Sequence, residues 1–134
     1  MKANEMIDKI AVNTANRKIS WENYKNNSLN FHCKFDTYQH FVPDESWISQ
    51  TTTGFFLLAT FKAMSVQNAD LEENALFYFQ KNSTCEPELI EKSSISVLAL
   101  LKTIEISNYQ KIQIEAKTIS EETGNEIEDF LNSL

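Results

Sequence analysis

The two histidines are the first candidates for chemistry, because imidazole readily exchanges protons near neutral pH. His40 precedes Asp44 and Glu45 by only a few residues, so it could form an acid-base pair with either carboxylate in one loop. Catalysis would also need a nucleophile or substrate within hydrogen-bond reach, and no nucleophile neighbours them in sequence. We therefore expect ordinary surface residues here and no enzyme; an enzyme built on His40 is a competing hypothesis.

Metal and cofactor chemistry are not expected either. His32 and Cys33 are adjacent in a predicted strand, so their side chains should point to opposite faces and cannot easily share a metal ion. Cys33 would lie on the apolar face, where core packing is the simpler interpretation. Glycine occurs only at positions 54 and 124, which excludes a glycine-rich phosphate loop. We predict no cofactor.

Aromatic and basic residues alternate near the start of the chain, as they do on some RNA-binding surfaces. The residues are Lys18, Trp21, Tyr24 and Lys25. The net charge of −7 opposes this interpretation, because an acidic protein repels phosphate backbones. We do not expect nucleic-acid binding.

Acidic residues are concentrated in the second half of the chain. Residues 1–67 carry seven Lys or Arg and six Asp or Glu, whereas residues 68–134 carry five Lys and thirteen Asp or Glu. Such a surface attracts basic partners and speeds their association. Solubility is the simpler explanation unless the acids share one face. The predicted partner-binding residues are Glu72, Glu73, Glu86, Glu88 and Glu91, with Tyr78 as an exposed aromatic anchor.

Several segments that could position these groups have strand patterns. Residues 29–37 alternate apolar and polar side chains, which predicts a strand with one buried face, and residues 17–21 could form a shorter one. Residues 47–52 and 55–61 read as a hairpin closed at Thr53-Gly54, where glycine would accept a positive φ. Residues 75–81 form another strand pattern, and residues 64–74 and 82–92 read as loops.

The strand predicted over residues 55–61 is apolar on both sides, which is unusual for a half-exposed sheet. The helix predicted over residues 93–106 can cover one of its faces. The other face, with Phe56 and Leu58, needs the N-terminal or C-terminal helix. If neither reaches it, this face is the strongest candidate for a protein-binding patch.

Three helices are predicted. Residues 3–14 carry a narrow apolar stripe, and residues 93–106 follow a serine cap and should end at Ser107-Asn108. Residues 109–117 suit either a strand or a helix. Thr123 and Glu126 have capping-box spacing, so a last helix should follow and could begin as early as Thr118. The predicted fold class is α+β: one domain over residues 1–134, with an antiparallel meander of about four to five strands packed with these helices.

The compartment predicted for this domain is the cytoplasm. No apolar run approaches the roughly 20 residues of a membrane-spanning helix, and the N-terminus lacks the apolar core of a signal peptide. Cys33 and Cys85 form no CxxC motif, so two free thiols in a reducing environment are expected. The 42% hydrophobic content supports a folded protein and not a disordered one.

The opening of the chain resembles small uncharacterised proteins of bacterial genomes and mobile elements, which begin with a helix, a Thr and then Lys-Ile-x-Trp. The matching residues are Ile7, Ile10, Thr14, Lys18, Ile19 and Trp21. The resemblance covers about twenty residues. It implies a bacterial or phage origin and a small accessory protein, and it supplies no catalytic residues.

From these patterns we expect a protein-binding domain of the immunity or inhibitor type, which neutralises a basic partner such as a nuclease toxin. The alternative is a protein similar to secretion chaperones, or a self-associating homodimer built on residues 55–61.

Overall fold

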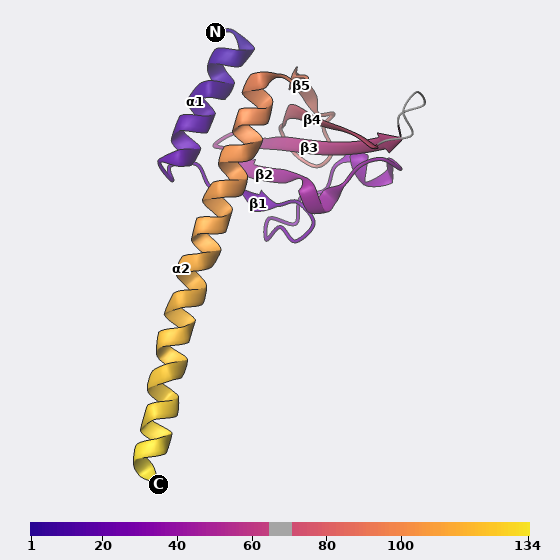
Figure 1. The fold of residues 1–134 in the computed structure, drawn as a ribbon. Helices are drawn as coiled ribbons and strands as arrows, with labels where there is room; N and C mark the ends of the chain where they lie inside the picture. The colour runs from indigo at the N-terminus through magenta and orange to yellow at the C-terminus, as the bar shows by residue number, and fades with distance from the viewer. Residues whose placement is uncertain (65–70) are drawn as a thin grey trace.

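The computed structural model describes the backbone of residues 1–64 and 71–134, and the side chains within those ranges except 63–64, 71–73 and 113–120. It contains an α+β fold, as predicted (Figure 1). The elements in chain order are α1 (Ala3–Ala15), β1 (Glu22–Asn23), the short 3₁₀ helices η1 (Lys34–Thr37) and η2 (Pro43–Glu45), β2 (Trp47–Gln50), β3 (Phe55–Met64), β4 (Leu71–Gln80), β5 (Glu88–Glu91) and α2 (Ile95–Ser133).

The five strands form one antiparallel sheet in the order β1-β2-β3-β4-β5, which is the predicted meander. Its centre is the long hairpin of β3 and β4, in which Phe55 pairs with Gln80 and Met64 with Leu71. Two loop predictions were therefore wrong in part. β3 and β4 extend into residues 64–74, and β5 lies within residues 82–92. Both segments are polar, which disfavours a strand, but pairing with the neighbouring strand stabilises the extended backbone.

The β2–β3 hairpin is present, but its connection is a four-residue loop over residues 51–54. The Thr51 hydroxyl accepts hydrogen bonds from the backbone N–H groups of Gly54 (2.9 Å) and Thr53 (3.3 Å), which closes the loop. The prediction of a positive φ at Gly54 was wrong. Glycine is needed there for space, because a Cβ would lie 2.7 Å from the carbonyl oxygen of Gln80.

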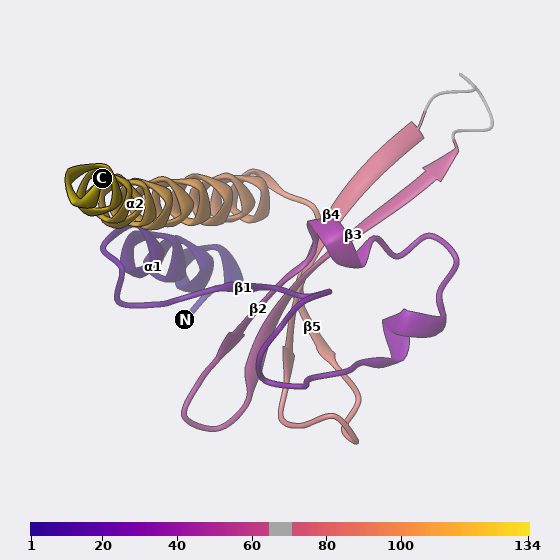
Figure 2. The same ribbon diagram turned by 90° about the horizontal axis from the view of Figure 1, so that it is seen from below.

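Both faces of β3 are covered, so the patch proposed for residues 55–61 is absent. Leu58 packs in one core cluster with Ile7 of α1 and Leu100 of α2. Leu57 packs in a second cluster on the other face, and this face is covered by the connection between β1 and β2. Figure 2 shows the two helices on one side of the sheet and this connection on the other.

Residues 29–37 form no strand, although their alternation is real. Phe31, Cys33 and Phe35 are buried, and the residues between them are exposed. The segment is irregular and ends in η1, and it lies across β3 as a cover for the second core cluster. Alternation indicates which side chains are buried, but it does not show that the backbone pairs with another strand.

The N-terminal helix is confirmed and ends one residue later than predicted. Residues 17–21 do not form a strand. They are a turn that leads from α1 into β1, in which Arg17 adopts a left-handed φ of 61°. The turn is fixed to the helix by the Lys18 N–H, which donates to the Asn13 carbonyl at 2.8 Å.

The two helices predicted over residues 93–106 and 118–134 are parts of one helix, α2, and residues 109–117 are helical. Ser94 caps α2 by accepting a hydrogen bond from the Val97 N–H, as predicted. The helix does not end at Ser107-Asn108. Both side chains are partly buried beside α1, and helix packing outweighs their weak helix propensity. None of the helices in the described residues is long and apolar enough to cross a membrane.

Candidate functional site

The predicted acidic site is only partly within the described side chains. Glu72 and Glu73 lie in β4, where their backbones pair with Ala63 and Lys62, but their side chains lie outside the described residues. Glu88 and Glu91 lie on the edge strand β5, and Glu88 is exposed. Glu86 forms an ion pair with Lys34 at 2.6 Å, so its charge is already balanced. A role for these acids in partner binding stays a prediction.

Tyr78 is half-buried and not the exposed anchor that was expected. Its ring lies 5.0 Å from the ring of Phe35, in the cover over the second core cluster. Burial raises the pKa of the Tyr78 phenol, and the nearby Lys34 opposes this rise. Tyr78 therefore stabilises the fold, and only part of its surface is open to a partner.

The histidines and cysteines do not form a catalytic group among the described residues. His40 is exposed, and His32 Nδ1 lies 3.5 Å from Asp36 Oδ2 on the surface. Cys33 is buried and Cys85 is exposed, and both thiols are free. Burial raises the pKa of the Cys33 thiol, which keeps it protonated and weakly nucleophilic. No group of three metal-ligating side chains occurs in the described part of the chain.

The most distinctive feature is the part of α2 that leaves the domain, residues 112–133, which we call the α2 arm (Figure 1). At 1.5 Å per residue these 22 residues extend roughly 33 Å. From residue 121 onward every side chain is exposed. Large apolar residues are among them: Ile127 is 54% exposed, Phe130 63% and Leu131 58%.

Apolar residues recur along the arm at the spacing of a helix interface. Tyr109 and Ile112 are exposed just before and at its start, and the sequence places Ala116, Ile119 and the polar Thr123 at steps of three or four residues after them. Ile127, Phe130 and Leu134 follow at the same spacing. This period is typical of helices that pack against another helix. The sequence contained this signal at residues 127–134, but the helix was expected to fold back onto the sheet.

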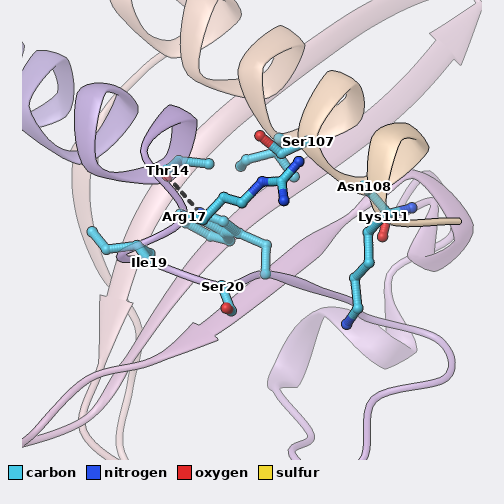
Figure 3. Close-up of a pocket in the computed structure, with 9 residues that line it drawn as sticks. Thr14, Arg17, Ile19, Ser20, Ser107, Asn108 and Lys111 are labelled. Atoms are coloured by element: carbon cyan, nitrogen blue, oxygen red, sulfur yellow. Dashed lines mark hydrogen bonds between the residues drawn. The ribbon is translucent and has the colours of Figure 1, made fainter. Parts of the chain in front are cut away.

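A pocket lies where α2 leaves the domain, between the end of α1, the turn after it and α2 (Figure 3). Its volume is about 290 Å³. Its lining residues are Thr14, Arg17, Ile19, Ser20, Trp21, Ile104, Ser107, Asn108 and Lys111. A wider groove of about 670 Å³ shares Trp21 and Lys111 with it and runs toward the β2–β3 loop.

The floor of this pocket is held by one buried hydrogen-bond chain. The Trp21 indole Nε1–H donates to the Thr14 hydroxyl at 2.9 Å (Figure 3). That hydroxyl donates in turn to the Ile10 carbonyl at 2.8 Å. These two hydrogen bonds fix the indole ring against the end of α1. Sequence reasoning missed this site. The sequence shows Lys18 and Trp21 as basic and aromatic neighbours. Lys111 lies ninety residues after Trp21, and its place in the pocket wall depends on how the helices pack.

No family model, curated protein or solved structure matches this chain closely enough to indicate a relative.

Proposed function

We propose that the chain is a non-enzymatic protein-binding domain of the immunity or inhibitor type, and that its α2 arm binds a basic partner such as a nuclease toxin. One observation carries the proposal: the arm exposes Ile127, Phe130 and Leu131 on a helix that no described part of the chain covers. A helix in a globular protein normally buries its apolar stripe.

The arm has little reason to persist as a helix alone. Helices in proteins gain most of their stability from packing, and Gly124 lowers helix stability by about 1 kcal/mol relative to alanine. Each large apolar side chain gains about 1.5–3 kcal/mol when it is fully buried. Covering Ile127, Phe130 and Leu131 would thus stabilise both the arm and the complex.

The charge of the arm favours a basic partner. Residues 118–134 contain no Lys or Arg, and their acids flank the apolar stripe. The acids are Glu121, Glu122, Glu126, Glu128 and Asp129. Complementary charge accelerates association, and apolar contacts at the centre of an interface provide most of the affinity.

The test is affinity capture from the native host, followed by titration of the recovered protein against three forms of the chain. We expect a basic partner whose affinity falls with added salt and falls at least tenfold in the double variant Ile127→Ser/Phe130→Ser. Asn132→Ser, on the same helix but outside the stripe, is the matched control and should bind like the wild type. Recovery of only acidic proteins, or equal binding by both variants, would refute the proposal.

Self-association is the second candidate, and the charge sequence of α2 supports it. Lys102, Lys111 and Lys117 precede the acidic segment, so two copies of α2 in antiparallel orientation would place opposite charges together. Light scattering separates the two candidates. If the protein stays monomeric over a 100-fold range of concentration, a basic partner remains the occupant of the arm. If it forms a dimer, and Phe130→Ser dissociates that dimer, self-association is favoured.

A further inference from the structure

The pocket beside Trp21 gathers positive charge on a protein whose net charge is −7. Arg17 and Lys111 line the pocket, and Lys18 joins Lys111 in the adjoining groove. None of these three cations has an ion-pair partner among the described side chains. Cations without partners at the border of a cavity attract anions, because the cavity walls concentrate their field.

The backbone at Arg17 sets where its side chain lies. Arg17 follows the end of α1 with a φ of 61°, a position at which glycine is the usual residue. This φ belongs to the C-terminal cap of α1, in which the backbone N–H groups of Arg17 and Lys18 donate to the Thr14 and Asn13 carbonyls. The conformation turns the arginine side chain toward Ser107 and Asn108 of α2, across the pocket (Figure 3).

The remaining walls combine apolar and polar surface. Ile19, which is partly buried, supplies apolar area, whereas Trp21 is 9% exposed and Ile104 only 1%, so they add little surface. Hydroxyl and amide groups of Ser20 and Asn108 supply hydrogen-bonding capacity. A volume of about 290 Å³ suits a small organic molecule.

We propose that this pocket binds a small organic anion with an aromatic body and one carboxylate or phosphate group. The body packs against Ile19 and the small exposed part of Trp21, and Arg17 and Lys111 attract the anionic group. Arginine binds either oxyanion through two parallel hydrogen bonds. The site is separate from the α2 arm, since no residue of the arm lines it.

The test is a ¹H–¹⁵N NMR titration with indole-3-acetate, phenyl phosphate and the neutral control indole. Binding should move the indole N–H signal of Trp21 and leave that of Trp47, which does not line the pocket. We expect one of the two anions to bind at least tenfold more tightly than indole. The anion that does so shows whether the pocket prefers a carboxylate or a phosphate group. Both anions binding no better than indole would overturn the proposal.

Variants separate binding from folding. Arg17→Gly should lower the affinity for the anion roughly tenfold. It should not lower the melting temperature, because glycine suits the left-handed backbone. Lys111→Gln should weaken anion binding to a similar extent. If Arg17→Gly folds poorly, the result with Lys111→Gln decides whether the pocket binds the anion. Lys92→Gln removes the same charge from the surface before α2 and should bind like the wild type. If Lys92→Gln weakened anion binding as much as the pocket variants do, the effect would be one of overall charge, and the proposed binding site would be refuted.

Discussion

The hydrogen bond between Trp21 and Thr14 allows a quantitative test of how the pocket is built. Thr14 is 1% exposed, and its hydroxyl accepts from the Trp21 indole N–H and donates to the Ile10 carbonyl. Thr14→Val replaces this hydroxyl with a methyl group of similar size. The indole N–H then remains in the buried site without an acceptor.

The cost can be estimated from this geometry. A buried donor without a partner costs about 1–3 kcal/mol. Valine and threonine are both β-branched with similar helix propensity, so the helix itself contributes little to the difference. We expect a loss of about 2 kcal/mol, which for a domain of this size lowers the melting temperature by roughly 8 °C.

Urea unfolding followed by tryptophan fluorescence, together with calorimetry, measures this loss. Thr14→Ser retains the hydroxyl and is the matched control, with a smaller loss from one missing methyl group. Trp21→Phe removes the donor. In that background Thr14→Val should cost less than about 0.5 kcal/mol, because no indole N–H is left unpaired. An equal cost in both backgrounds would refute the reasoning.

Four further changes test other parts of the structure. Gly124→Ala should raise the helical circular-dichroism signal and helix stability by about 1 kcal/mol, because its Cβ would meet no atom within 4 Å. Gly54→Ala should lower the urea midpoint, with a loss of about 1–3 kcal/mol, because the new Cβ collides with the Gln80 backbone. Leu100→Ala should cost about 2–5 kcal/mol in the same assay, because Leu100 is fully buried. Burial raises the pKa of the Tyr24 phenol, so the stability that Tyr24 contributes should be fully present below pH 10 and be lost as pH rises above it. Tyr24→Phe should reduce the alkaline loss in pH-dependent melting, and the loss that remains is due to Cys33 and Tyr78, whose pKa values burial also raises.

The sequence was most informative where side-chain pattern and backbone pairing coincide. The β2–β3 hairpin and the start of α2 at its serine cap were predicted from local signals, since turn residues and caps act within a few positions. Residues 29–37 show the limit. Their alternation correctly placed Phe31, Cys33 and Phe35 in the core, but an irregular chain that packs across a sheet produces the same burial pattern as a strand.

The amino-acid sequence by itself determined the α+β class, the meander and the acidic second half, because periodicity and charge are local properties. Only the tertiary structure decided that residues 95–133 form one helix that leaves the domain. It also decided that Arg17 and Lys111 line one pocket. Both outcomes depend on contacts between residues far apart in the chain, and local propensity does not specify these contacts.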